Sequence, residues 1–167
     1  RKRPGSVGVD INPHAGVDIV HDLDRIPYPF EADSFDEIYV DNCLEHLAEP
    51  VRVMEELHRI ARPNALVKII VPYFRSVWAC IDPTHRHFFT VDSFSYFDPE
   101  HENCRLYGYS AARFRVERIV FNETVRRGIL TGLLVRLANR KPRHYEQYLS
   151  HLYPLDDLSY YLRVRKS

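Results

Sequence analysis

The sequence has no long apolar run and few cysteines, and these absences exclude several classes of protein. None of its apolar segments approaches the roughly 20 residues that a membrane-spanning helix needs. The basic residues 1–3 are not followed by the apolar stretch of a signal peptide. The three cysteines, Cys43, Cys80 and Cys104, form no CxxC pair and no even disulfide set. A reducing compartment is therefore expected, and we predict a cytoplasmic protein.

The 167 residues also lack internal repeats and low-complexity linkers, so a single domain over 1–167 is predicted. A hydrophobic content of 45% supplies a core and excludes disorder as the main state. The net charge is zero, but residues 1–110 hold 11 Lys/Arg against 18 Asp/Glu, and residues 111–167 hold 12 against 5. A partner would therefore meet an acidic half and a basic half.

Short β-branched runs alternate with helical or polar stretches through the first 75 residues. This pattern predicts strands over 7–11, 17–20, 35–40 and 66–71, and a helix over 50–61 that begins at Pro50. Such alternation is typical of an α/β fold with a mostly parallel sheet and helices on both faces. The second half predicts helices over 91–97, 124–139 and 144–153, and an antiparallel edge pair of strands over 114–121 and 160–164.

Three carboxylates, Asp10, Asp22 and Asp41, follow predicted strands. In an open α/β sheet ligands bind beyond the carboxyl ends of the strands, and a carboxylate there can accept hydrogen bonds from both vicinal hydroxyls of a ribose. Structural roles compete, because Asp10 could form an Asx turn with the following Asn12, and Asp22 a turn or a helix cap. For each aspartate taken singly, the structural role is favoured.

Taken in order, however, three segments resemble the class I S-adenosylmethionine-dependent methyltransferases, most closely the type 11 methyltransferase domain. They are VGVDINP, DIVHDLDRIPYPFEADSFDEIYVDNCLEHL and MEELHRIARPNALVKIIVPYF, within residues 6 to about 74. The most specific stretch, IPYPFEADSFDEIYVDNCLEHL, is similar to the LPFPDNSFDxV…LEHL signature of that family. The resemblance implies a Rossmann-like fold, S-adenosylmethionine as cofactor, and an enzyme that transfers a methyl group.

The resemblance also implies which residues bind the cofactor. They are Asp10 at the ribose with Ile11 beside it, Asp22 with Leu23 at the adenine, and Asp41 with Asn42 beside the methionine part. Each pair follows one of the predicted strands, so the three pairs are expected at one edge of the sheet.

Two departures from the family pattern affect this prediction. The family has Pro-Gly-Gly before its fifth strand, and here Asn64 stands at the first glycine, where asparagine can still adopt the left-handed conformation. The family's first strand and GxGxG loop are expected just before residue 1, so we predict an N-terminally incomplete copy with a gap between the strands at 7–11 and 35–40. The alternative is a non-catalytic, degenerate methyltransferase-fold module that binds a partner. A glycine-rich run encoded upstream would favour the enzyme.

Several residues are candidates for the acceptor side. His85 and His87 follow the strand at 66–71, where the family places substrate-facing residues, and either could take a proton from a hydroxyl acceptor. A solvated surface loop is the competing and slightly favoured role. The remaining substrate candidates are Arg86 beside them, His46 at the mouth of the site, and Tyr73 and Phe74 as pocket walls, for which packing at the rim or in the core is the alternative.

No metal is predicted, although a metal is an alternative. Relatives that methylate quinone precursors and are thought to bind a divalent metal carry Glu-x-x-Glu-His at this point of the family pattern. Here Asn42 precedes Glu45 and His46, one carboxylate short of that pattern. Together with His85 and His87, these residues also lack the sequence spacing of a zinc site.

Residues 126–143 carry six Lys/Arg and no acid around an apolar run. A helix with its apolar face on the sheet is favoured, and a peripheral contact with anionic lipid at the inner membrane face is the alternative. Because aromatic and basic residues do not interleave, no nucleic acid partner is predicted. A basic cover favours an anionic acceptor, small or lipid-linked, whose charge Arg86, Arg126 or Arg127 would meet.

Overall fold

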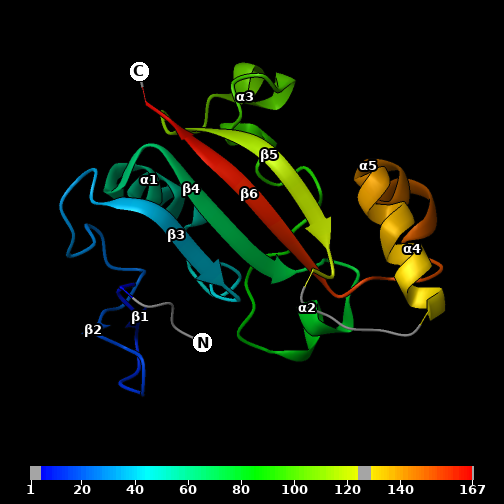
Figure 1. Cartoon of the computed structure of the whole chain (residues 1–167), viewed down its shortest axis with the longest axis horizontal. Coiled ribbons are helices and arrows are strands. Elements are labelled where there is room, and N and C mark those ends of the chain that lie inside the picture. Colours follow the sequence, from blue (N-terminus) through cyan, green and yellow to red (C-terminus); the bar gives the residue numbers. More distant parts are fainter. Residues whose placement is uncertain (1–4, 124–128, 167) are drawn as a thin grey trace.

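The computed structural model describes residues 5–123 and 129–166, drawn in colour in Figure 1. Its strands are β1 (Val9–Asp10), β2 (Ile19–Val20), β3 (Phe35–Asp41), β4 (Ala61–Pro72), β5 (Arg113–Phe121) and β6 (Asp157–Arg165). Its helices are α1 (Pro50–Ile60), α2 (Val77–Ile81), α3 (Glu102–Tyr107), α4 (Ile129–Arg140) and α5 (Pro142–His144), with a 3-10 turn at Ser95–Phe97 and a π-helical turn at Tyr145–Leu149.

The described strands form two sheets. β1 and β2 pair in parallel as a short two-stranded sheet, and the other four strands have the order β3-β4-β6-β5. β3 and β4 are parallel, while β6 runs antiparallel to both of its neighbours. Figure 1 shows β1 and β2 beyond β3, apart from the larger sheet. The result is an α/β fold with a mixed sheet.

The predicted arrangement is confirmed in most respects and wrong in one. The four N-terminal strands lie where the sequence predicts them and pair in parallel, and β5 and β6 form the predicted antiparallel pair. They do not share one sheet, because within the described residues no strand bridges β1 and β3. The predicted gap between those two strands is thus present.

The α1–β4 unit packs as its sequence pattern predicts. Pro50 occupies the first turn of α1, and the helix buries Met54 and Leu57 among the side chains of its core-facing side. The chain turns directly into β4, where Asn64 takes a φ of 64°, the left-handed conformation expected of it. Alternate β4 residues from Ala65 through Val71 are buried, so this strand forms the centre of the core.

The second half departs further from its predicted elements. The helix predicted over 91–97 is only the turn at Ser95–Phe97, and that over 144–153 shortens to α5 and the π-helical turn. The hydroxyl of Tyr145 donates to the carbonyl of Tyr153 and accepts the N–H of Leu155. These hydrogen bonds hold residues 153–155 against the π-helical turn, so the predicted helix does not continue to residue 153. α2 and α3 were not predicted, because each is a short, locally capped segment without a long apolar period.

Of the helix predicted over 124–139, residues 124–128 lie outside the described part, and α4 continues it to Arg140. None of the helices that the structure describes is both long and apolar enough to cross a bilayer.

Candidate functional site

The carboxyl ends of β1 and β2 bring two of the predicted aspartates to neighbouring positions. The backbone N–H of His21 donates to the carbonyl of Asp10 at 2.9 Å, so the residue before Asp22 is joined to the end of β1. Parallel pairing of Asp10 with Val20 sets this register. The two carboxylates therefore belong to one edge, as the sequence predicts.

Asp10 makes the Asx turn that is its structural alternative. Its Oδ1 accepts the N–H of Asn12 at 2.8 Å, and its Oδ2 lies 3.3 Å from Nε2 of His14. The hydrogen bond from Asn12, followed by the contact with His14, lowers the pKa of the Asp10 carboxyl. With 41% of its side chain exposed, Asp10 remains accessible as an anion, and Ile11 beside it is exposed.

Asp22 and Leu23 lie in a turn that is tied to the loop after β3. Oδ1 of Asp22 accepts the N–H of Asp24 at 3.0 Å, the turn expected as its structural role. The carbonyl of Leu23 accepts the hydroxyl of Tyr28, and Oδ1 of Asp24 accepts the N–H of Ala48 at 2.7 Å. The hydrogen bond between Asp24 and Ala48 thus holds the turn after β2 against the segment after β3.

The third predicted pair, Asp41 and Asn42, ends β3. Asn42 has a φ of 46° and donates its backbone N–H to the carbonyl of Ile70 in β4. Its side-chain amide donates to Oδ1 of Asp41 at 2.9 Å. Both side chains are exposed, so the structure leaves them at the surface of this edge.

Glu45, three residues after Asn42, is the most unusual polar residue of the site. It is 1% exposed, and neither carboxylate oxygen has a hydrogen-bond partner. Burial raises the pKa of this carboxyl. Its backbone carbonyl accepts the N–H groups of Arg86 and His87 at 2.8 and 3.3 Å, which holds the segment after β4 against the segment after β3.

The structure brings His46 and His85 together beside this carboxylate. Their ring centroids are 4.6 Å apart, and Nε2 of His85 lies 4.0 Å from Oε1 of Glu45. His87 is turned elsewhere, with Nε2 on the carbonyl of Leu47 at 2.9 Å. The sequence singled out each histidine but gave no reason to group two of them with Glu45, because the grouping depends on how two crossovers meet.

Tyr73 and Phe74 lie at the end of β4 but differ in burial. Tyr73 is fully buried and makes edge-to-face contacts with Phe74 and Phe121 at centroid distances of 4.9 and 5.0 Å. Phe74 is partly exposed, with the guanidinium of Arg75 4.9 Å from its ring centroid. Tyr73 therefore packs in the core, which is the alternative to its predicted role as a pocket wall, while Phe74 reaches the surface.

Asp157 is a candidate that the sequence did not reveal. It begins β6 opposite Pro72, and its Oδ1 is buried without a hydrogen-bond partner. Burial, together with the negative charge of Glu123, raises the pKa of its carboxyl to about 6. No sequence motif marks this residue, because its environment is created by strands that are distant in sequence.

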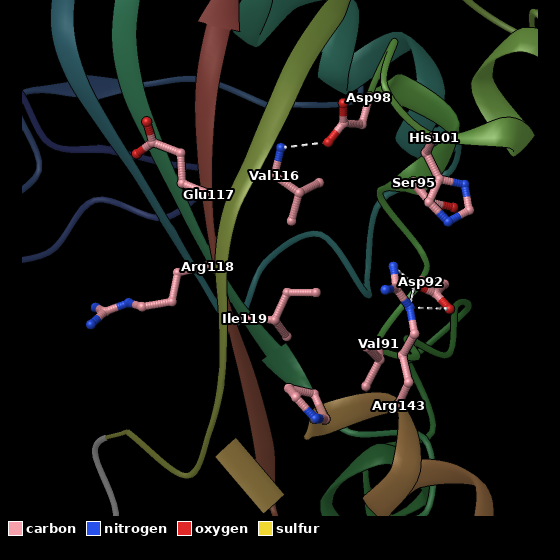
Figure 2. Close-up of a pocket in the computed structure, with 11 residues that line it drawn as sticks. Val91, Asp92, Ser95, Asp98, His101, Val116, Glu117, Arg118, Ile119 and Arg143 are labelled. Carbon is pink, nitrogen blue, oxygen red and sulfur yellow. Dashed lines mark hydrogen bonds and ion pairs between the residues drawn. The ribbon is translucent and has the colours of Figure 1, made fainter. Parts of the chain in front are cut away.

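A cavity of about 240 Å³ lies away from these residues, between β5, the 3-10 turn and α5. None of the predicted site residues lines it. Figure 2 shows Arg143 directed at Asp92, whose carboxylate it contacts at 2.8 Å, and Asp98 bonded to the N–H of Val116. These charged groups are engaged in structural contacts.

The described part of the basic segment, α4, contacts the sheet at the end of β5. α4 buries Ala138, and both amide atoms of Asn139 bond the backbone of Phe121 at the end of β5. Leu133 and Leu137 are exposed on the same helix. Arg126 and Arg127 lie outside the described residues, so the acceptor contact and the membrane contact of this segment stay predictions.

Comparison with known proteins relates part of the chain to a known domain family. Residues 6–69, less than half of the chain, match the family model described as "Methyltransferase domain". No curated protein matches the chain. The match covers Asp10, Asp22 and the segment at 44–46, the residues on which the sequence resemblance rested.

Solved structures share the fold. An S-adenosylmethionine-dependent methyltransferase from Mesorhizobium loti is 14% identical, with a TM-score of 0.56 over 94% of this chain and 79% of that one. A putative methyltransferase from Haloferax volcanii, solved with the methyltransferase activator Trm112, is 16% identical, with a TM-score of 0.54 over 93% and 65%. The [4+2]-cyclase SpnF is 16% identical, with a TM-score of 0.52 over 91% and 57%.

The chain thus spans less than two thirds of the length of the last two proteins. At these identities the likeness concerns the fold alone, and SpnF, a [4+2]-cyclase, shows that this fold also occurs in a protein named for a different reaction. The family match and the fold together confirm the resemblance to the class I methyltransferases and their Rossmann-like architecture.

Proposed function

We propose that this chain is a class I methyltransferase that transfers a methyl group from S-adenosylmethionine to a small or lipid-linked acceptor. The match of residues 6–69 to a methyltransferase domain and the fold shared with solved methyltransferases support this proposal. One observation carries the proposal. The hydrogen bond from His21 to Asp10 joins two strand-ends, so that Asp10 and Asp22 share the edge at which α/β sheets bind their ligands.

The residues at this edge fit the cofactor chemically. A carboxylate offers about four lone-pair sites, and Asn12 and His14 take only two of those on Asp10. The remaining sites suit the two hydroxyls of a ribose. Asp22 and Leu23 would hold the adenine, and Asp41 with Asn42 the methionine part. S-adenosylmethionine supplies an electrophilic methyl on a sulfonium, and the chain's own contribution is to position the groups and exclude water.

The acceptor side is assigned to the segment after β4. It lies against the segment after β3 through the two hydrogen bonds to the Glu45 carbonyl, so the rings of His46 and His85 are neighbours, and Arg86 follows His85 in the same segment. For a hydroxyl acceptor, His85 or His87 would remove the proton as the methyl is transferred. Arg86 is exposed and suits an anionic acceptor.

A methyl-transfer screen tests this proposal. The complete protein would be incubated with S-adenosylmethionine carrying a labelled methyl group and with matched anionic and neutral acceptors. We expect transfer to anionic acceptors, reduced by roughly 10²–10⁴-fold in His85→Ala or His87→Ala if that histidine is the base. Arg126→Ala and Arg86→Ala should raise KM for anionic acceptors. Equal activity in all variants, or a preference for cationic acceptors, contradicts this acceptor assignment. Failure to bind the cofactor at all favours the alternative of a non-catalytic, partner-binding module.

A further inference from the structure

Three side chains from two different crossovers converge beside the ends of β3 and β4. Glu45 and His46 follow β3, and His85 follows β4. One potential ligand atom of each lies within 4.8 Å of the others. The segments are held together by the hydrogen bonds that the carbonyl of Glu45 accepts from Arg86 and His87. The cluster is therefore built by the backbone and not by chance contact of flexible side chains.

The hydrogen bonds of the two histidines determine which ring nitrogen is free. Nδ1 of His85 lies 3.1 Å from the carbonyl of Ala79, which can only accept, so this nitrogen carries the proton. Nδ1 of His46 lies 2.9 Å from Oγ1 of Thr84. That hydroxyl donates its own proton to Asp82 at 2.7 Å, so it must accept from His46. In both neutral rings the lone pair is left on Nε2.

This arrangement is typical of metal-ligating histidines. Such residues donate one ring N–H to a carbonyl or a polar oxygen, which fixes the tautomer and the ring orientation and leaves the other nitrogen for the metal. The chain of Asp82, Thr84 and His46 is such a support on one side, and the carbonyl of Ala79 supports His85 on the other.

Glu45 supplies an independent observation that points to a ligand. Its carboxylate is buried, and both oxygens lack a hydrogen-bond donor. A buried polar group without a partner is costly, since it has lost its water without replacement. The neighbouring Nε2 of His85 does not repair this, because 4.0 Å is beyond hydrogen-bond distance.

From these observations we propose that Glu45, His46 and His85 bind a divalent transition-metal ion, through one carboxylate and two Nε2 atoms. Imidazole and carboxylate together suit Zn²⁺ and its neighbours among the first-row metals, and two histidines with one glutamate form a known catalytic zinc set that leaves a position open. Metal–ligand bonds of about 2.0–2.2 Å would draw the three groups closer together than they lie here.

The ligand set differs from the Glu-x-x-Glu-His pattern, because its third member is His85 of the next crossover and not a second carboxylate. The inference concerns these side chains and stands without the proposed methyl transfer. With a metal bound, Nε2 of His85 no longer accepts a proton. A hydroxyl acceptor would then be activated by the metal, which lowers the pKa of an oxygen that it binds.

Calorimetric titration of the metal-free protein with Zn²⁺ tests the site, with Co²⁺ and its visible absorption as a second probe. We expect one equivalent to bind, and Glu45→Gln, His46→Gln and His85→Gln each to weaken binding by at least 100-fold. Thr84→Ala keeps all three ligands but frees His46 and should weaken binding by roughly 10–100-fold. His14→Gln is the matched control, because it removes an exposed imidazole that also lies beside a carboxylate.

Glu45→Gln is nearly isosteric and should fold, which circular dichroism checks, and Zn²⁺ should raise the melting temperature of the wild type but not of this variant. Loss of binding in the three ligand variants with retention in His14→Gln supports the site. The proposed metal site is overturned if the wild type does not bind Zn²⁺, or if Glu45→Gln binds Zn²⁺ as tightly as the wild type. Because binding of the adenosyl cofactor is measured separately, failure of the metal site does not imply failure of the proposed enzyme.

Discussion

At the scale of single residues, two kinds of carboxylate stand out: those at the carboxyl ends of the strands β1 and β2, and those that are buried without a hydrogen-bond donor. Asp10 and Asp22 could be selected because a carboxylate after a buried strand has a recognisable position in α/β folds, and the structure places both at one edge. Glu45 and Asp157 differ, since what marks them is a buried oxygen without a donor. That property depends on neighbours from other strands, so no local pattern could reveal it.

Asp157 gives a stability prediction with a definite sign. Its pKa is about 6 in the folded chain against an ordinary value of 3.8, so the folded state holds this proton more tightly than the unfolded state. The free energy of unfolding should therefore fall as the pH rises from about 4 to 6. Asp157→Asn removes this loss and should be more stable than the wild type at pH 7, by about 1–2 kcal/mol.

Urea unfolding of both proteins between pH 3.5 and 7 measures this difference directly. The two stabilities should converge below pH 4, where Asp157 is protonated in both states. A variant that is less stable at pH 7 would show that the carboxylate has a favourable partner in solution.

At the scale of elements, the long periodic segments were predictable and the short ones were not. α1 and β4 followed from a strong 3.6 period and a β-branched run, and Asn64 took the turn conformation expected of it. α2 and α3 are five and six residues long and begin at capping side chains, Ser76 and His101 respectively. Such segments are stabilised by the surrounding packing and leave little periodic signal.

The loop before β3 offers a prediction at this scale, because one ion pair fastens it to α1. Glu56 is buried, accepts the N–H of Tyr28 at 2.9 Å and receives two hydrogen bonds from Arg59. Arg59 also donates to the carbonyls of Tyr28 and Phe30. Its contact with Arg59 lowers the pKa of Glu56, so this stabilisation is present at neutral pH and is lost as the pH falls through that lowered value.

Glu56→Gln should lower the free energy of unfolding by about 2–3 kcal/mol at pH 7, because Arg59 loses its charged partner within a partly buried cluster. Chemical denaturation measures this change. Glu49→Gln is the matched control at the N-cap of the same helix, since the Glu49 side chain forms an exposed pair with Arg52 at 3.8 Å and its loss should change stability by less than about 0.5 kcal/mol. Equal effects of the two substitutions would contradict the role of the Glu56 cluster.

At the scale of the whole molecule, the fold brings together charges that the sequence separates. Lys166 pairs with Asp33, and Arg143 with Asp92. The acidic and basic halves therefore partly neutralise each other, which the count along the chain could not indicate. The strand order, with β6 inserted between β4 and β5, was likewise beyond the pattern of the chain, which predicted only that the two last strands pair.

At this scale the proposed function implies that Asp10 contacts the cofactor ribose, and calorimetric titration of the complete protein with S-adenosylhomocysteine tests that claim most directly. We predict saturable binding of about one equivalent to the wild type. Asp10→Ala should weaken it by roughly 1–3 kcal/mol through loss of charge-assisted hydrogen bonds, while Asp36→Ala, which alters an exposed aspartate paired with Arg62, should leave it unchanged. Unchanged affinity in Asp10→Ala would remove this residue from the site, and absence of binding to the wild type would contradict the methyltransferase account itself.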